Sequence, residues 1–349
     1  MRILISNDGP TAHYYIRMGF ARALAASGHE VKFWDIGVKN TFDAFDEFSP
    51  DIFVGQSYNL NRDVLACLKR RPNCKITLKA GDWGYFYLNE ENQRFPILFA
   101  SNEEILNVQK LLETNTISFI DMHYHPRSIG KTHGFWKEKL GIKVVGLMSA
   151  ADVFDYTGGK YQESFKSDLA FVGGRWGYKS QTLTPWLIKF IEKYPELNIK
   201  IFGNQSWGIP QYCGFLDTAY VKDVLASATI CPNISEPHSQ AFGFDIIERP
   251  FKLLSNKCFV ISDYVEDLKY ILPEEIVYAH TPEEFHELCI HYLNYPEERQ
   301  PIIDRGYKAV IDNHTYFHRA EQFFNELDLP QEAVKVMETY SKIKEKLGL

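Results

Sequence analysis

Residues 231–263, CPNISEPHSQAFGFDIIERPFKLLSNKCFVISD, form the stretch that decides the fold of this chain. They begin with an apolar run, pass through a polar loop, and enter a helical pattern at about Gly243. That pattern ends at Asn256, and residues 258–261 predict a short buried strand. A loop, a helix with Arg249 on its loop side and a following parallel-type strand suit an anion site at the carboxyl edge of a sheet.

The part of the chain before this stretch alternates short apolar strands with helical patterns. Residues 2–6 predict a strand, residues 12–28 a helix that ends at a glycine, and residues 31–35 the next strand. Strand, turn, helix and strand of this length form a βαβ unit with a right-handed crossover. Further strands are expected at 51–54, 75–78, 96–99, 117–120, 143–147, 168–172 and 199–203, and helices at 61–70, 103–113 and 183–191.

A family resemblance begins at Arg249. RPFK at 249–252, followed by LLSNKCFVISD at 253–263, resembles the donor-site segment of the CgeB-like spore-maturation glycosyltransferases. The resemblance covers the C-terminal half well and the N-terminal half by general pattern. It departs at one position, because the family has a ribose-binding Glu where this chain has Lys252. Downstream it continues at 282–284, 295–299 and 314–319.

Two α/β halves in series predict the GT-B architecture, in which two Rossmann-like, doubly wound domains face each other across a cleft. Residues 149–166 are the candidate linker, because they contain a Gly-Gly pair and many polar residues. We expect an N-terminal acceptor-binding domain at 1–155, a C-terminal nucleotide-sugar-binding domain at 156–330 and a C-terminal helix at 331–349. That helix has one apolar face and is expected to pack back on the N-terminal domain, the alternative being a partner-binding or solvated helix.

The composition is that of an acidic globular protein. The chain of 349 residues is long enough for two domains with substantial cores. Its net charge of -7 argues against a nucleic-acid partner, which would favour a basic surface. The scattered cysteines have no CxxC spacing, and the N-terminus does not resemble a signal peptide. We therefore expect a cytoplasmic protein, with peripheral membrane contact left open.

The loop GGRWGYK at 173–179 follows a strand and precedes a helix. Its glycines let the backbone approach a phosphate, and Arg175 and Lys179 add full charges. Together with Arg249 they resemble the basic clamp of the family on the donor diphosphate, the alternative being a tight turn with solvated cations. Fixed cations can stabilise a diphosphate leaving group without a metal, and the chain has no Asp-x-Asp triplet. We therefore expect no metal and no cofactor besides the nucleotide-sugar co-substrate.

Three further segments complete the predicted donor site. The turn at 214–216 matches the region that contacts the donor base in GT-B enzymes, although Phe215 could equally belong to the core. The polar loop 235–240 is expected to lie over the sugar. Glu248 precedes Lys252 by four residues on one helical face and is expected to take over the ribose, the alternative being a surface Glu-Lys pair. The donor-site candidates are Gly173, Gly174, Arg175, Lys179, Gly214, Phe215, Leu216, His238, Ser239, Gln240, Glu248, Arg249 and Lys252.

Sugar transfer with inversion needs a carboxylate or a histidine that takes the proton of the acceptor hydroxyl. In GT-B enzymes this group usually comes from the strand-end loops of the N-terminal domain. Asp82 is the first candidate because it ends a strand between two glycines, and Asp8 and His13 are the others. A turn or capping role is the alternative for Asp82. A metal site at His123 and His125 is disfavoured, because no carboxylate pair is evident nearby.

The sequence therefore predicts a metal-independent, inverting glycosyltransferase of the hexosyltransferase type. Its expected partners are a nucleotide-sugar donor and a glycan, lipid-linked or small-molecule acceptor, without nucleic acid. Three alternatives stay open: a catalytically silent relative that binds a nucleotide or glycan, a GT-B-fold sugar-nucleotide epimerase, and a DNA-modifying transferase, which the acidic charge disfavours.

Overall fold

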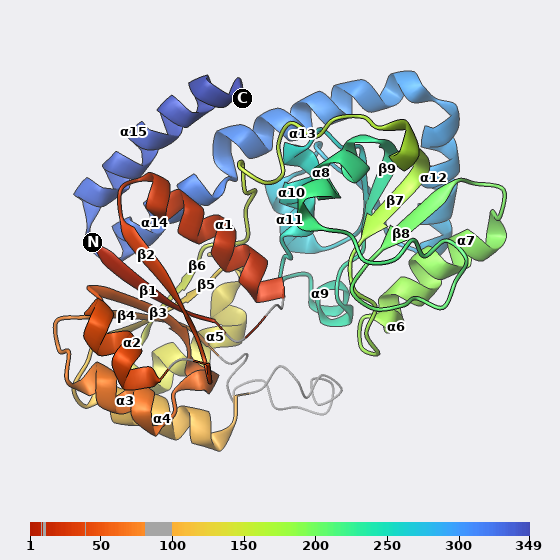
Figure 1. The fold of residues 1–349 in the computed structure, drawn as a ribbon. Helices are drawn as coiled ribbons and strands as arrows, with labels where there is room; N and C mark the ends of the chain where they lie inside the picture. Colours follow the sequence, from red (N-terminus) through yellow and green to blue (C-terminus); the bar gives the residue numbers. More distant parts are fainter. Residues whose placement is uncertain (8, 10–11, 39, 81–99) are drawn as a thin grey trace. The chain divides into compact units, whose positions relative to one another are not determined.

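The computed structural model describes residues 1–349 except 8, 10, 11, 39 and 81–99, and the side chains of residues 12 and 13 also lie outside the description. The chain divides into two units, Met1–Met148 with Phe317–Leu349, and Ser149–Tyr316. Each unit is built on a parallel sheet with helices packed against it (Figure 1). The two predicted parallel α/β domains are thereby confirmed.

The first unit contains a six-stranded parallel sheet with the order β2-β1-β3-β4-β5-β6. The chain runs from β1 to β2 on one side of β1 and then crosses to β3 on the other side, so the topological switch point lies between β1 and β3. β1 and β5 are near-continuous buried runs, as expected for strands covered on both faces of the sheet. The strands are β1 (Arg2–Asn7), β2 (Glu30–Asp35), β3 (Ile52–Gln56), β4 (Lys75–Lys79), β5 (Ile117–Asp121) and β6 (Lys143–Gly146).

The helices of the first unit begin with side-chain caps where the sequence supplies them. Asn40, Asn61 and Ser101 each accept a hydrogen bond from a backbone N–H in the first turn of the helix that follows. The helices are α1 (Ala12–Ala26), α2 (Thr41–Phe48), η1 (Ser57–Asn59), α3 (Arg62–Lys69), α4 (Asn102–Leu112), α5 (Ile129–Leu140), α14 (Tyr316–Glu326) and α15 (Pro330–Leu347).

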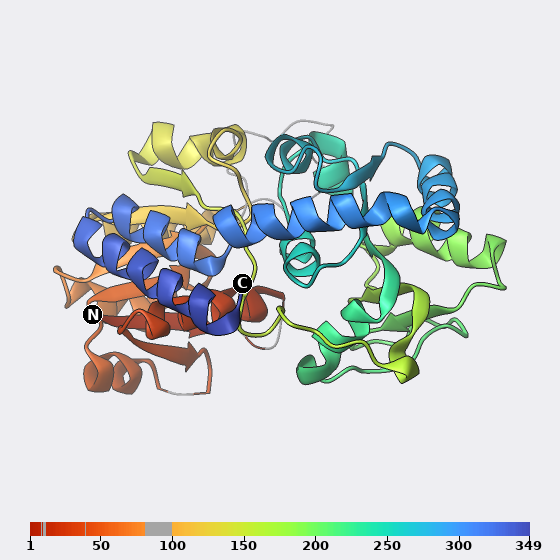
Figure 2. The same ribbon diagram turned by 90° about the horizontal axis from the view of Figure 1, so that it is seen from above.

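Both C-terminal helices belong to the first unit (Figure 2). On α14, the ring of Phe323 meets Phe20 of α1 at a centroid distance of 5.2 Å. Tyr340 of α15 stacks on Phe317 at 5.0 Å. From the sequence we expected only residues 331–349 to return to this unit. The return begins at Phe317 because α14 also buries its aromatic side chains there.

The second unit contains a five-stranded parallel sheet with the order β11-β10-β9-β7-β8. The chain leaves β7 for β8 on one side and later returns to β9 on the other, so the switch point lies between β7 and β9. The strands are β7 (Ser167–Val172), β8 (Ile199–Phe202), β9 (Ala228–Asn233), β10 (Val260–Asp263) and β11 (Val277–Ala279). The helices are η5 (Glu163–Phe165), α6 (Ser180–Leu183), η6 (Thr184–Ile188), α7 (Lys189–Lys193), α8 (Thr218–Ala226), α9 (Pro237–Phe242), α10 (Arg249–Ser255), α11 (Glu266–Ile271), α12 (Pro282–Asn294), η7 (Pro296–Glu298) and α13 (Arg299–Asn313).

The helix predicted to begin at about Gly243 begins later. A separate short helix, α9, ends at Gly243, whose φ of 77° is left-handed. Asp245 is also left-handed, with a φ of 72°, and α10 starts only at Arg249, with a proline in its first turn. Two left-handed residues cannot continue a right-handed helix, so the apolar spacing around Ile246 does not reflect helical backbone.

The segment predicted as a linker, 149–166, is packed into the second unit. The backbone N–H of Gly159 donates to Oδ1 of Asn256 at 3.0 Å. A Cβ atom at this position would collide with the carbonyl of Lys222, so only glycine fits. The unit accordingly starts at Ser149 instead of residue 156. Among the helices that the structure describes, none is long and apolar enough to span a bilayer.

Candidate functional site

Two cations meet at the carboxyl edge of the second sheet, at the switch point between β7 and β9. Lys179 follows β7, and its buried Nζ donates to the carbonyl of Ile234 at 2.9 Å. Nη1 of Arg249, from the start of α10, donates to the same carbonyl at 3.3 Å. Crevices at such switch points are the usual ligand sites of open α/β sheets. Lys179 and Arg249, two of the predicted donor cations, therefore lie together.

Arg249 is packed tightly against the end of β7. Its guanidinium lies over the ring of Phe171, 4.4 Å from the centroid. A Cβ atom on Gly173 would lie 2.7 Å from Nη2 of Arg249, so this glycine makes room for the arginine. Burial lowers the pKa of Arg249 to about 10, against the opposing effect of nearby carboxylates such as Glu236. The guanidinium therefore stays charged at neutral pH.

Lys179 forms an ion pair with a neighbouring carboxylate. Its Nζ lies 2.9 Å from Oε1 of Glu236, which precedes α9. Burial lowers the pKa of Lys179, and the charge of Glu236 opposes that shift. The pair ties the loop after β7 to the loop after β9, so Lys179 has a structural task besides any ligand that it binds.

Asp263 organises the same loop from the end of β10. Both of its carboxylate oxygens accept a hydrogen bond from the backbone N–H of Ser235 at 3.0 Å, and Oδ2 also accepts one from Nε2 of Gln240 at 2.7 Å. Burial raises the pKa of Asp263, while these hydrogen bonds oppose the rise. The amide nitrogen of Gln240, which we expected near the sugar, is thus used inside the protein.

Arg175, the third predicted cation, points to another loop. Its Nη1 donates to the carbonyl of Trp207 at 2.8 Å, and its Nε donates to Oγ of Ser180 at 3.3 Å. Trp207 follows β8, on the opposite side of β7 from β9. The structure therefore brings Lys179 and Arg249 together on one carbonyl and connects Arg175 to a different strand end.

Glu248 and Lys252 form the expected pair, with Nζ and Oε2 3.1 Å apart. The pair is not at the surface, because Glu248 is 8% exposed. Its other oxygen accepts a hydrogen bond from the hydroxyl of Tyr316 at 2.8 Å, and the Lys252 ammonium lies over the ring of Tyr156. Burial lowers the pKa of Lys252, but Glu248 and Tyr156 outweigh it and the net shift is upward. The alternative of a solvated Glu-Lys pair is therefore wrong.

His238 lies between a tyrosine and an aspartate. Its Nδ1 is 2.8 Å from the hydroxyl of Tyr178, and its Nε2 is 2.7 Å from Oδ2 of Asp245. Ser239 fixes the same turn by donating to the carbonyl of Asp245 at 2.9 Å. Tyr178 immediately precedes Lys179, so this row of polar groups extends the cation cluster along the sheet edge.

The turn predicted to contact the donor base lies beyond β8. Gly214 has a φ of 101° and its carbonyl accepts a hydrogen bond from the backbone N–H of Gly203 at 3.1 Å. Phe215 is 73% exposed, so the alternative that placed it in the core is wrong. Leu216 packs in part against the core, and Gly174 lies beside Asn204. An exposed aromatic ring next to a glycine turn fits a stacking surface.

The predicted base candidates cannot be placed. Asp8 and Asp82 lie outside the described residues, and His13 falls within α1 but its side chain is not described. The structure does show a pair that we did not predict from the sequence, Asp121 and His123 at the end of β5. The sequence signal was an Asp two positions before a His at a strand end, whereas we had considered only the two histidines, His123 and His125, as a metal site.

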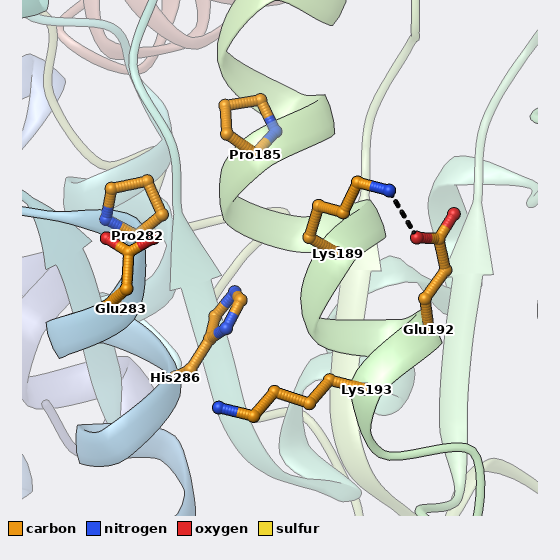
Figure 3. A pocket seen from close by; sticks show the side chains of 7 residues that line it. All are labelled: Pro185, Lys189, Glu192, Lys193, Pro282, Glu283 and His286. Atoms are coloured by element: carbon orange, nitrogen blue, oxygen red, sulfur yellow. Dashed lines mark hydrogen bonds and ion pairs between the residues drawn. The ribbon is translucent and has the colours of Figure 1, made fainter.

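The second unit also has a surface groove of about 480 Å³, and its lining does not include the candidate residues described above (Figure 3). Lys189 at its edge is paired with Glu192 at 2.7 Å. The lining residues are Pro185, Lys189, Glu192, Lys193, Pro282, Glu283 and His286. No residue of the cation cluster takes part, so size alone does not identify the site.

Comparisons with known proteins place these observations in a family context. Residues 181–325 match the family model described as glycosyl transferase-like. Among solved structures, an alpha-glucosyltransferase in complex with UDP-glucose and DNA containing an abasic site matches with a TM-score of 0.66 and 11% identity, over 94% of this chain and 99% of that chain. Sucrose-phosphate synthase from Thermosynechococcus elongatus matches with a TM-score of 0.60 and 11% identity, over 99% and 100%.

A putative UDP-N-acetylglucosamine 2-epimerase from Listeria monocytogenes matches with a TM-score of 0.55 and 10% identity, over 94% of this chain and 98% of that chain. No curated protein matches this chain in sequence. The CgeB-like assignment within the glycosyltransferases stays a prediction. Taken with the two parallel sheets, these likenesses show that the chain has the GT-B fold, with a glycosyl transferase-like domain at residues 181–325.

Proposed function

We propose that this protein transfers a sugar from a nucleotide-activated donor to an acceptor hydroxyl. The observation that carries the proposal is the meeting of Lys179 and Arg249 at the carbonyl of Ile234, at the switch point of the second sheet. Buried, charged donors at such an edge suit the diphosphate of a nucleotide sugar. The glycosyl transferase-like match, which includes Arg249, supports the same reading.

The proposed chemistry uses fixed cations at the leaving group. As the bond between the anomeric carbon and the diphosphate oxygen breaks, its electron pair stays on the diphosphate. Arg249 and Lys179 then offset the growing negative charge, and a preorganised site makes such stabilisation large. The transfer we propose is of the hexosyl type, without a required metal, to a glycan, lipid-linked or small-molecule acceptor.

Glu248 is the proposed acceptor for the ribose hydroxyls. Each carboxylate oxygen has two lone pairs, so the bonds from Tyr316 and Lys252 do not exhaust its capacity. Lys252 stands one turn later, where the family that the sequence resembles has a Glu, and in our proposal it holds Glu248 in place instead of binding the ribose itself. This division of roles accounts for the departure at position 252.

The test is nucleotide binding by the native protein and by Arg249→Ala. A panel of nucleoside diphosphates and nucleotide sugars is titrated by calorimetry, and hydrolysis or transfer is followed with the ligand that binds. Loss of a charged hydrogen-bond donor should weaken binding by about 2 kcal/mol, roughly 30-fold. Arg305→Ala is the matched control, because Arg305 lies at an exposed position of the same unit, where it donates to the backbone carbonyl of Glu274. Equal affinity of both variants for every ligand would sink the assignment.

An epimerase is the second candidate, because a putative sugar-nucleotide epimerase shares the fold. Incubation of the bound nucleotide sugar without any acceptor separates the two. An epimerase would produce a second nucleotide sugar, whereas a transferase would at most release nucleotide slowly. The exclusion of nucleic acid stays a prediction from net charge, since one structure of the same fold contains DNA. A duplex oligonucleotide belongs among the acceptors tested.

A further inference from the structure

The loop after β7 presents an exposed tryptophan at the carboxyl edge of the second sheet. In residues 173–179, which the structure describes in full, Trp176 and Gly177 are the exposed positions. Trp176 is 46% exposed, whereas the other tryptophans in the described part of the chain are buried: Trp34, Trp136, Trp186 and Trp207. A large aromatic ring at the edge where open α/β sheets bind ligands is a candidate for a ligand contact.

Hydrogen bonds on both sides of Trp176 hold its loop in place. Before it, Nη1 of Arg175 donates to the carbonyl of Trp207 at 2.8 Å. After it, the backbone N–H of Ser180 donates to the carbonyl of Trp176 itself at 2.9 Å. The backbone that carries the indole is therefore fixed before a ligand arrives, so little conformational entropy is lost when one stacks on it.

A column of three rings supports one side of the indole. The ring centroid of Trp176 lies 5.2 Å from that of Tyr178, with 37° between the ring planes. Tyr178 stacks in turn on His238 of α9, at 5.8 Å and 23°. The hydroxyl of Tyr178 lies 2.8 Å from Nδ1 of His238, and Nε2 of His238 lies 2.7 Å from Oδ2 of Asp245. The column is thus held at its far end, and Trp176 is its exposed end.

The column and the cation cluster share the same two loops. Lys179 follows Tyr178 directly, and its partner Glu236 immediately precedes α9, which carries His238. These loops follow β7 and β9, the strands on either side of the proposed diphosphate site. The predicted base contact, Phe215, follows β8, on the other side of β7. With the base at Phe215, the ring column is left for the group at the other end of the diphosphate, the sugar.

A hexopyranose offers an indole a suitable surface. Most of its hydroxyls project outward from the ring, whereas its C–H groups lie on the ring faces. The face of an aromatic ring carries partial negative charge, which attracts these weakly positive hydrogens. The contact also removes apolar surface of both partners from water. An indole therefore distinguishes a nucleotide that carries a sugar from one that does not.

We propose that Trp176 recognises the donor sugar by stacking its indole on the apolar face of the sugar ring, an inference that rests on the proposed function. Tyr178 and His238 are its positioning residues, because they support the indole from the side away from the sugar. The contact uses residues of the second unit alone. It adds affinity for a nucleotide sugar and none for the nucleoside diphosphate, whose contacts are the cations.

The first experiment compares Trp176→Ala with the native full-length protein by calorimetry. The probes are UDP with UDP-glucose and GDP with GDP-mannose, and the pair that the native protein binds more tightly is used. Loss of the indole should weaken binding of the nucleotide sugar about 10-fold, and binding of the nucleoside diphosphate should stay native. Trp176→Phe keeps a smaller ring and should lose less. Tyr295→Ala, which removes another exposed aromatic ring of this unit at the end of α12, should bind both probes natively.

The second experiment measures quenching of tryptophan fluorescence by acrylamide. A sugar stacked on Trp176 should protect the exposed indole, so the nucleotide sugar should reduce quenching more than the nucleoside diphosphate does. Trp176→Phe should abolish that difference, which assigns it to this tryptophan and not to the others.

Native affinity of Trp176→Ala for the nucleotide sugar would overturn the proposal. Equal losses for both probes would also overturn it, because the indole would then contact the nucleotide instead of the sugar. A native protein that binds neither member of any pair would contradict the proposed function itself, and this result is seen before any variant is made.

Discussion

The carboxylate of Glu248 contacts two side chains, one distant in the sequence and one close to it. One oxygen accepts a hydrogen bond from Tyr316, near the end of the second unit, and the other contacts Lys252, one helical turn away. Burial raises the pKa of Tyr316 well above its usual range, and Glu248 adds to the rise, so the phenol remains a donor. The tyrosine thus serves the fold alone, whereas the glutamate serves the fold and, in our proposal, the ribose.

Tyr316→Phe and Glu248→Gln separate these two tasks. Removing a hydrogen bond to a charged group costs about 1.5–3 kcal/mol, so Tyr316→Phe should lower the free energy of unfolding by that amount and leave nucleotide affinity native. Glu248→Gln should lower both the free energy of unfolding and the affinity for nucleotide. Urea denaturation and calorimetry measure them, and Tyr220→Phe, at an exposed position, is the control for loss of a hydroxyl. If Tyr316→Phe weakens nucleotide binding as much as Glu248→Gln does, the ribose role of Glu248 is lost.

At the scale of elements, buried parallel strands were the most predictable parts. Residues 2–6, 75–78 and 117–120 were predicted as strands and lie inside β1, β4 and β5, because a strand covered on both faces is a continuous apolar run. The helix expected from Gly243 was misplaced. Its apolar spacing is compatible with helix, and only the left-handed backbone at Gly243 and Asp245 interrupts it.

In the candidate site, too, some residues could be predicted from the local sequence and others could not. Lys179 and Arg249 were found because glycines and cations beside strand ends are a local signal. The role of Asp263 was not predicted, because its partners Ser235 and Gln240 come from the loop after another strand. The Asp121–His123 pair was visible as an Asp-x-His spacing, but the burial that makes it informative appears only after the chain has folded.

Helix α15 covers a buried histidine of the first unit. His29 lies 3.6 Å from Oε2 of Glu332, and its ring lies 4.8 Å from that of Phe324 on α14. Burial lowers the pKa of His29 from 6.5 to about 4, helped by the N-terminal amine and Lys335 and opposed by Glu332. A neutral His29 is therefore part of the docking surface of the C-terminal helices.

The free energy of unfolding should fall as pH drops from about 6.5 to about 4. In that window the unfolded chain binds a proton at His29 that the folded chain does not, so acid favours unfolding; above 6.5 the ring is neutral in both states and has no effect. Urea denaturation at several pH values measures the slope. His286 in the second unit also has a lowered pKa and adds to the slope of unfolding free energy against pH. The native protein is therefore compared with His29→Leu, in which this slope should be smaller. Equal slopes in the two proteins would contradict this assignment.

On the scale of the whole molecule, the first unit is discontinuous in sequence and the second is continuous. The start and the end of the second unit are held together, because the backbone N–H of Ala151 donates to the carbonyl of His314 at 2.8 Å and that of Tyr316 donates to Ala151 at 3.0 Å. A domain with adjacent termini and its own sheet can in principle fold alone. The first unit needs residues 317–349, whose aromatic side chains it buries.

Residues 149–316 expressed alone should therefore fold cooperatively and bind nucleoside diphosphate with near-native affinity, because the cation cluster lies wholly within them. Extending the fragment to the boundary expected from the sequence, residue 330, adds Phe317, Phe323 and Phe324 without the α1 surface that covers them. Burial of one such side chain is worth about 1.5–3 kcal/mol, so fragment 149–330 should expose apolar surface and self-associate.

Fragment 1–148 should stay unfolded until it is mixed with 317–349. Circular dichroism, sedimentation and calorimetry measure these properties, and a fragment 149–316 that is unfolded, or folded but unable to bind nucleotide, would show that the cation cluster depends on the first unit.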